Sequence, residues 1–471
     1  MAKSPPELSR RTNPTLKKPS DHKQRTTMSV SSLYSPKLSV FLLALCVSLF
    51  TLYHIQSLHA PPSSPPWSPM NYWERVANCT QELKPTVEKL RQAVTFLPLK
   101  DLRYADKALQ GHTWFMSSMN DTHEEGEVQY QQFPSEPSKG RLLCFKGKDT
   151  RDGSWNSYAL AWPEALPINA KLLKGLTFVS YNHYDYGNIW HGLSATASFV
   201  AWHLRNGCES PNRWILYHWG ELRFTMALWL RILAEATYGG APYIERFEGI
   251  DDGQPVCFEK AVVMRHNEGG MSRNRRVETY DLMRCRARMF CNVSLEGRIA
   301  EVNKQGLPVI GMTLLLRTGA RSFKNESAVI GILEKECAKI DGCRLMVAYS
   351  SNLTFCEQVK LMSLTDILAT PHGAQLTNLF LMDRNSSIME FFPKGWLELA
   401  GELGETPDGD ECPYGEDGRR CMSLYKNGKI GFNETELTEW TKKVLNEEKL
   451  KKLEDAAANK IDSSTSICAC G

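Results

Sequence analysis

The sequence lacks several features that would assign it to common functional classes. It contains no internal repeat, no C-x-x-C pair with further Cys or His partners, and no phosphate-binding P-loop pattern. The missing cysteine pattern argues against a structural zinc module. The missing P-loop pattern argues against a sulfotransferase, which would need such a loop at a strand end to bind its phosphosulfate donor.

The sequence also lacks an excess of positive charge outside the first 37 residues. Residues 1–37 contain eight Lys and Arg against Glu7 and Asp21, a net charge of +6, so the remainder carries −3 of the total of +3. Binding to nucleic acid depends on concentrated Lys and Arg that neutralise phosphates. We therefore expect no nucleic-acid partner.

An apolar run follows the basic segment. Residues 38–53 contain no charged side chain, and His54 and Ile55 extend the run, which approaches the roughly 20 residues of a membrane-spanning helix. Because Lys and Arg remain on the cytosolic side, the run predicts a signal anchor at 38–55, a cytosolic amino terminus and a luminal body. The alternative is a cleaved signal peptide, but the basic region is long and 57–60 is a poor cleavage site. The expected location is the Golgi membrane.

Two further features agree with a luminal body. Thirteen of the 14 cysteines follow the run, and Cys46 lies within it; an oxidising compartment permits disulfides. The local spacing suggests pairs Cys285/Cys291, Cys337/Cys343 and Cys412/Cys421, with buried free thiols as the alternative. Seven N-x-[ST] sequons are present: Asn78, Asn120, Asn292, Asn325, Asn352, Asn385 and Asn433. All except Asn325, which is discussed below, are taken as N-glycosylation candidates.

The chain divides into six segments. The expected boundaries are a basic cytosolic tail at 1–37, the anchor at 38–55, a Pro/Ser-rich stem at 56–75, an acceptor-side α/β domain at 76–295, a nucleotide-sugar-binding α/β domain at 296–455 and a disordered tail at 456–471. No feature of the sequence fixes the oligomeric state.

Alternating strands and helices indicate the fold class. In the first domain, strands are expected at 176–180 and 214–217, with helices after 191 and at 224–236. The second domain alternates more clearly, with apolar strands at 309–316, 345–349, 367–370 and 388–392, helices between them and a charged helix at 434–451. This order predicts a doubly wound sheet that binds ligands at the carboxyl ends of its strands.

Three groups of polar residues lie at those strand ends. Arg317 and Arg321 follow the strand at 309–316 and could clamp a diphosphate, or could instead pair with surface glutamates. His372 and Gly373 lie between a strand and a helix, where free backbone N–H groups can bind anions. Glu390, inside an apolar strand, is either an acceptor for a ribose hydroxyl or an outward-facing edge residue.

The stretch around His372 resembles glycosyltransferase family 61. The family pattern of Asp, strand, H-G-A-G-L-T-N, Phe-Leu, Glu and Pro is matched by Asp366, the segment 372–378, the pair 380–381, Glu390 and Pro393. Arg317, Arg321 and Asn325 are similar to its R-x-x-x-R-x-x-x-N segment. The resemblance implies a GT-B fold, in which two Rossmann-like domains face a cleft, an inverting mechanism and a UDP-sugar donor.

A weaker resemblance covers the amino-terminal domain. The aromatic segment 184–191 is similar to the Asn-x-x-His region of the branch that adds xylose to N-glycans. Many members have an Asp about four residues after this His, whereas this chain has Ser194, Ala195 and Thr196 there. The resemblance thus implies that the catalytic base is His191 itself or Asp185. Two other departures are Gln375 for Gly and Asp383 for Pro.

The resemblance also implies a donor site. Its expected residues are Arg317, Arg321, Asn325, His372, Gly373, Ala374, Thr377, Asn378 and Glu390. Asn325 has two alternative roles, as a helix cap or as a glycosylation site. Neither a cofactor nor a metal is expected, because the guanidinium groups and the 372–374 loop would stabilise the leaving diphosphate. The competing metal-binding D-x-D pattern, Asp408-Gly409-Asp410, lies in an acidic loop and is interpreted as solvated.

The function expected from these residues is the transfer of a sugar, with xylose or another pentose favoured, from a UDP-sugar to a cell-wall polysaccharide or N-glycan in the Golgi. The alternatives are N-acetylglucosaminyl transfer to protein O-glycans, and a catalytically inactive homologue that binds glycan or nucleotide.

Overall fold

The structure of the protein is a computed structural model. It describes residues 44–51, 83–99, 125–149, 156–182, 189–218, 224–264, 271–296, 298, 301–303, 305–393, 427–457 and 468–470. The chain forms two compact units, Met1–Leu83 and Lys84–Gly471. In the first unit residues 44–51 are helical, and the rest of the expected anchor at 38–55 lies outside the described residues. Among the described helices, none combines the length and the apolar composition required to cross a bilayer.

The first sheet of the second unit is mixed. Its strand order is β1-β4-β3-β8-β5-β6-β7, with β2 paired to β8. The strands β8, β5, β6 and β7 run parallel, and the remaining pairs are antiparallel. The bounds are β1 Leu97–Pro98, β2 Tyr130–Phe133, β3 Leu142–Lys146, β4 Ser157–Ala161, β5 Lys171–Asn182, β6 Arg213–His218, β7 Tyr243–Ile244 and β8 Val256–Met264.

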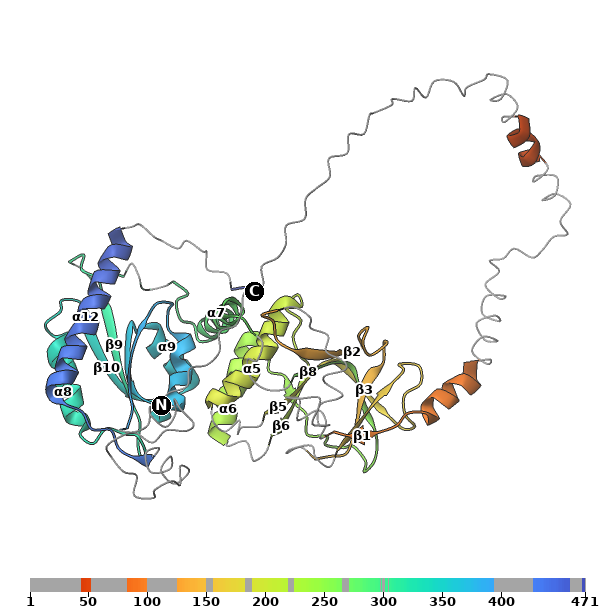
Figure 1. Ribbon diagram of the computed structural model, residues 1–471, viewed down its shortest axis with the longest axis horizontal. Coiled ribbons are helices and arrows are strands. Elements are labelled where there is room, and N and C mark those ends of the chain that lie inside the picture. The colour runs from red at the N-terminus through yellow and green to blue at the C-terminus, as the bar shows by residue number, and fades with distance from the viewer. Residues whose placement is uncertain are drawn as a thin grey trace, which may run out of the picture. The chain divides into compact units, whose positions relative to one another are not determined.

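Three helices cover one face of this sheet (Figure 1). They are α5 Ile189–Arg205, α6 Phe224–Tyr238 and α7 Arg273–Phe290. Side chains alternate between the faces of a strand: Phe178 of β5 packs under the helices, whereas Val179 contributes to a separate core on the opposite face. The elements expected at 176–180, 214–217, after 191 and at 224–236 are therefore confirmed.

The second sheet is fully parallel, in the order β10-β9-β11-β12. Its strands are β9 Ile310–Leu316, β10 Cys343–Tyr349, β11 Ile367–Pro371 and β12 Ser387–Phe391. The connecting helices are α8 Glu326–Cys337, α9 Phe355–Ser363 and the 3-10 helix η3 Ala374–Leu381, and α12 Glu434–Ala457 follows. Every β9 side chain is buried, as expected for a parallel strand covered on both faces. The expected mixed α/β architecture is confirmed.

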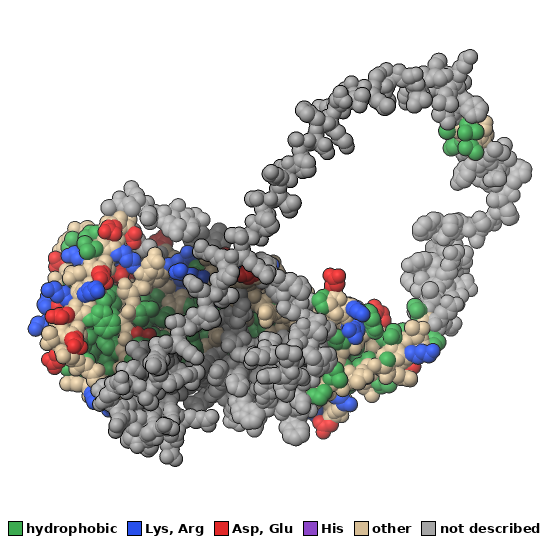
Figure 2. All heavy atoms as spheres, viewed as in Figure 1, with side chains coloured by type: hydrophobic (Ala, Val, Ile, Leu, Met, Phe, Trp, Pro, Cys, Tyr) green, Lys and Arg blue, Asp and Glu red, His purple; other side chains and the backbone are tan. Residues whose placement is uncertain are grey.

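The helices divide between the two faces of the second sheet. On one face, α8 and α12 pack on the even-numbered β9 residues, and Leu437 and Leu445 of α12 belong to this core. The solvent side of these helices carries interspersed charges of both signs, including Glu334, Lys335 and Lys443 (Figure 2). A surface of this kind favours solubility.

The other face of the second sheet shares a core with the first sheet. Leu315 of β9, Val359 of α9 and Phe380 of η3 belong to the same buried cluster as Trp202 and Leu233 on α5 and α6. Both α5 and α7 contact η3, and the rings of Trp229 and Phe355 meet edge to face at 5.6 Å. One helical layer therefore joins the two sheets through continuous apolar packing.

Five disulfides occur among the described cysteines, and only one of the expected pairs is among them. They are Cys144–Cys257, Cys208–Cys470, Cys285–Cys468, Cys291–Cys356 and Cys337–Cys343. The expected Cys337–Cys343 bond is confirmed, because α8 ends at one cysteine and β10 begins at the other. Cys412 and Cys421 lie outside the described residues.

The expected Cys285–Cys291 pair is wrong. Cys285 lies in α7 and Cys291 is the C-cap residue of that helix. Six residues of helix span about 9 Å, which exceeds the Cα separation that a disulfide can bridge. The two cysteines instead bond to Cys468 and Cys356.

The expected disordered tail at 456–471 needs a related correction. Residues 456 and 457 continue α12, and 468–470 are held by two disulfides, from Cys468 to α7 and from Cys470 to the turn after α5. A Cys-x-Cys segment in an oxidising compartment can be anchored covalently without any apolar pattern.

Candidate functional site

The candidate donor site lies where the strand order of the second sheet reverses. The chain runs from β9 outward to β10 and then returns to the opposite side of β9 to form β11. The carboxyl ends of β9 and β11 therefore flank a topological switch point, the usual ligand site of a doubly wound sheet. Arg317 directly follows β9, and His372 directly follows β11.

Arg317 and the loop after β11 are in direct contact. The Arg317 guanidinium donates a hydrogen bond from Nη1 to the His372 carbonyl oxygen at 3.0 Å. It also packs over Gly373, where an added Cβ would lie 2.2 Å from Nη1. Any side chain at this position would displace the guanidinium from its present place.

A second guanidinium lies close enough to affect the first. Burial, together with the positive charge of Arg321, lowers the pKa of Arg317 to about 10. Burial also lowers the pKa of Arg321. Arg317 forms no ion pair with any described carboxylate, and its buried Nε has no hydrogen-bond partner. Two cations held together in this way favour a bound anion, so the alternative of surface pairing with glutamates does not apply to Arg317.

The loop that carries Arg321 is fixed by a segment that sequence patterns did not assign. Arg321 has a left-handed backbone, with φ of 60°, and its N–H donates to the Gly428 carbonyl at 2.9 Å. Phe323 and Ile430 then form a parallel bridge. Residues 428–430 thus hold the β9–α8 loop in place.

His372 is held by three consecutive residues of β12 and its end. Its backbone N–H donates to the Phe391 carbonyl at 2.8 Å, and its ring Nδ1 lies 2.5 Å from Oε1 of Glu390. The ring also stacks on Phe392, with centroids 4.8 Å apart and planes inclined by 24°. The sequence marked His372 and Glu390 individually, but their contact and the role of Phe392 depend on strand register, which the motif does not specify.

Gln375, which replaces a glycine of the family pattern, stabilises the loop between β11 and η3. Its Nε2 donates to the Pro371 carbonyl at 2.6 Å. Thr370 ties the end of β11 to β9 by donating from Oγ1 to the Leu315 carbonyl at 2.9 Å. The loop between β11 and η3 is therefore preorganised by side-chain hydrogen bonds from both ends.

The other expected donor residues occupy different positions. Ala374 opens η3 and is half-buried. Thr377 and Asn378 in the same helix are 1% and 0% exposed, and Thr377 Oγ1 and both amide atoms of Asn378 lack hydrogen-bond partners. Asn325 is exposed and caps α8, accepting a hydrogen bond from the Ala328 N–H at 3.1 Å. The capping role suggested by the sequence is thus confirmed for Asn325.

The strand order of the first sheet also reverses, between β5 and β8. His191 is the third residue of α5, the helix that follows β5. Asp185 lies outside the described residues, as do Asn78, Asn120 and the Asp408–Asp410 pattern. Since α5 packs against η3, the backbone of His191 belongs to a helix that contacts the helix following the His372 loop. The remaining candidates for glycosylation, Asn292, Asn352, Asn385 and Asn433, are exposed.

Asp366, the first residue of the family pattern, serves a structural network at the opposite end of the sheet. This carboxylate is 6% exposed, accepts a hydrogen bond from the Gly311 N–H at 2.7 Å and pairs with Lys452 at 2.9 Å. Lys452 in turn donates to the Val309 carbonyl at 2.7 Å. The network fastens α12 to the amino ends of β9 and β11, away from the switch point.

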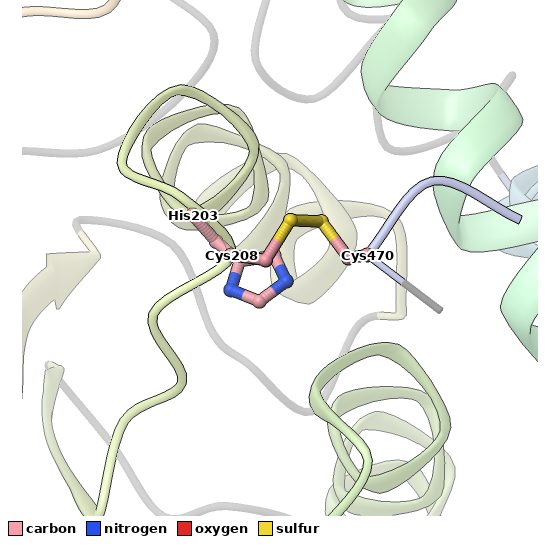
Figure 3. Close-up of side chains that lie close together, drawn as sticks. All are labelled: His203, Cys208 and Cys470. Atoms are coloured by element: carbon pink, nitrogen blue, oxygen red, sulfur yellow. A yellow bond between two sulfur atoms is a disulfide. The ribbon is translucent and has the colours of Figure 1, made fainter.

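One cluster with metal-ligand residue types occurs among the described residues. His203, Cys208 and Cys470 bring ligand atoms within 4.8 Å of one another (Figure 3). Both cysteines belong to one disulfide, and metal binding requires thiolates. His203 Nδ1 contacts the Glu209 carbonyl at 2.9 Å, and burial lowers the pKa of the ring. With the disulfide formed, this cluster is a structural contact.

A comparison with known protein families identifies the family of this segment of the chain. The model for the family Glycosyltransferase 61 matches residues 159–389. The protein carries a glycosyltransferase family 61 domain. No curated protein matches the chain significantly. The matched glycosyltransferase 61 segment begins in β4 and ends in β12, so it includes both switch points and every expected catalytic or donor residue except Glu390, which is the next residue.

Proposed function

We propose that the protein is an inverting, UDP-sugar-dependent glycosyltransferase of GT-B type that acts in the Golgi lumen, anchored by an amino-terminal helix. The match to the glycosyltransferase 61 family model supports the general class, which is sugar transfer. The observation that supports a diphosphate-bearing donor is the pair of partly buried guanidinium groups at the switch point of the second sheet.

The proposed reaction is a direct displacement at the anomeric carbon. A base, either His191 or Asp185, removes the proton of an acceptor hydroxyl, whose oxygen bonds to the sugar as the UDP departs. Arg317, Arg321 and the His372–Ala374 loop stabilise the developing negative charge on the diphosphate. No metal is assigned a role in this scheme. The favoured sugar is xylose or another pentose, and the favoured acceptors are cell-wall polysaccharides and N-glycans, because of the resemblance of residues 184–191 to the xylose-adding branch.

UDP binding by the full-length chain in detergent, measured by calorimetry, tests the donor site. Arg317→Ala removes a charge-assisted contact to phosphate, and we expect it to weaken binding at least about tenfold. Arg344→Ala is the matched control, since Arg344 is exposed at the start of β10. Normal UDP binding by Arg317→Ala would place the donor elsewhere.

A donor and acceptor panel tests the reaction. UDP-xylose, UDP-arabinose and UDP-N-acetylglucosamine are each combined with xylan oligosaccharides, N-glycans and O-mannosyl peptides. We expect His191→Ala to bind UDP normally and to lose transfer if His191 is the base. UDP binding without turnover on any acceptor would favour the inactive homologue, and loss of transfer in chelator would restore a metal-dependent mechanism.

A further inference from the structure

The contact between Glu390 and His372 carries an inference that rests on the proposed function and adds a residue to it. Glu390 pairs with Thr370 across β12 and β11, two residues before His372. The strand register therefore places the carboxylate beside the imidazole. Their Oε1–Nδ1 distance is 2.5 Å, and the two side chains are 29% and 31% exposed.

The restraint on His372 exceeds what a loop residue needs for packing alone. Its ring is held by Glu390 at Nδ1 and by Phe392 at one face. Its main chain is held by Phe391 through the N–H and by Arg317 through the carbonyl oxygen. The position of the ring is therefore coupled to the guanidinium that we assign to the diphosphate.

A carboxylate at Nδ1 also determines the chemistry of the ring. It accepts the Nδ1 proton, so that Nε2 is the nitrogen directed to a ligand. When the ring carries both protons, the carboxylate also offsets its positive charge. Without this charge, a protonated His372 would add a third cation beside Arg317 and Arg321, which already disfavour each other.

We infer that Glu390 is a positioning residue that fixes the orientation of His372, so that in the doubly protonated ring Nε2–H donates to the leaving diphosphate. As the acceptor oxygen bonds to the anomeric carbon, the bond from that carbon to the β-phosphate oxygen breaks and its electron pair remains on the oxygen. The Nε2–H hydrogen bond strengthens as this negative charge develops, and the proton stays on the ring. The acceptor proton leaves with the base, so charge and protons balance. Glu390 thereby acts through His372 and not through the ribose.

The test compares Glu390→Gln with the wild type in the full-length chain. The substitution keeps an oxygen acceptor for Nδ1 but removes the charge. Two readouts are used: UDP affinity by calorimetry, and release of UDP from each UDP-sugar of the panel, which requires no identified acceptor. We expect kcat for UDP release to fall about 10–100-fold, with UDP affinity within about threefold of the wild type, since the affected contact strengthens only in the transition state.

Two further measurements separate positioning from other roles. In a His372→Ala background, Glu390→Gln should have no further effect on kcat, because Glu390 then has no imidazole to hold. If Glu390 instead bound the ribose, Glu390→Gln would lower the affinity for UDP and leave the affinity for 2′- and 3′-deoxy-UDP unchanged. Glu439→Gln on the exposed surface of α12 is the matched control.

The outcomes separate the two proposals. Absence of UDP binding by the wild type would contradict the proposed function itself. UDP binding and release by the wild type, with Glu390→Gln equally active or with its loss additive to that of His372→Ala, would overturn the positioning role alone.

Discussion

Arg288 and Asp383 form an ion pair of 2.8 Å between α7 and the residues after η3, with the guanidinium only 3% exposed. Burial lowers the pKa of Arg288, and the Asp383 charge opposes this shift. Asp383 replaces a proline of the family pattern, and proline could not provide this carboxylate. Asp383, a departure from the family pattern that looked minor in the sequence, therefore links α7 of the first sheet's helical layer to the segment after η3 of the second sheet.

Removing the carboxylate of this pair should destabilise the protein strongly. Asp383→Asn leaves the buried Arg288 charge uncompensated, at an expected cost of about 3–5 kcal/mol in the free energy of unfolding. Urea denaturation followed by fluorescence measures this change. Replacing both residues, in Arg288→Met/Asp383→Leu, should recover most of the loss.

The exposed pair of Lys443 and Glu447 provides the control. Glu447→Gln should change stability by less than about 1 kcal/mol, since surface ion pairs contribute little. Equal effects of Asp383→Asn and Glu447→Gln would show that the buried pair does not hold the two layers together.

The Asn378 side chain should destabilise the unliganded protein. Its amide is fully buried without hydrogen-bond partners, and each unsatisfied buried group costs about 1–3 kcal/mol. Asn378→Leu, which is close in size, should therefore maintain or raise the melting temperature. If a donor-bound state satisfies this amide, the same variant should show a smaller rise in melting temperature with UDP.

Thr365 gives a contrasting case for the same thermal measurement. It is buried with its hydroxyl bonded to Thr313 at 2.6 Å and to the Leu361 carbonyl at 2.8 Å. Thr365→Val should lower the melting temperature because it removes satisfied bonds and leaves the Thr313 hydroxyl without this partner. A marked loss of stability in Asn378→Leu would contradict our description of that amide.

His203 should make stability depend on pH. Burial lowers its pKa in the folded state, whereas in the unfolded chain it titrates near its ordinary value of 6.5. The unfolded state thus binds more protons as the pH falls through about 6.5, and stability decreases in that direction. The loss approaches about 1.4 kcal/mol per pH unit below this value, until the folded state is also protonated.

Melting temperatures of the wild type and His203→Gln between pH 7.5 and 5.5 measure this contribution. The variant should lose less stability on acidification, because Gln does not titrate. Parallel pH profiles would show that His203 is protonated equally in the folded and unfolded states.

The pattern of apolar residues was sufficient for much of the architecture. The uninterrupted run at 309–316 predicts a buried parallel strand, and β9 is buried along its whole length. In contrast, α7 was not predicted. Its sequence is rich in arginine, and two of these side chains, Arg275 and Arg288, pair with Glu127 and Asp383 outside the helix, which no local periodicity indicates.

The residues of the candidate site could be predicted from the sequence, but the contacts between them could not. Arg317, His372, Gly373 and Glu390 were identified from strand ends and family resemblance, and the structure brings them into contact. Their pairing depends on the order β9-β11-β12 and on the register of Thr370 with Glu390. Both are set by long-range packing, so the sequence could not distinguish a ribose acceptor from a partner of His372.

The two disulfides of the 468–470 segment impose an order on maturation. Cys208 and Cys285 precede their partners by 262 and 183 residues. While the ribosome is still producing the sequence before Cys468, both thiols lack their native partners and remain open to mispairing with other cysteines. Complete oxidation therefore awaits nearly full synthesis, and a premature stop codon before residue 468 would yield a protein with two persistent reactive thiols.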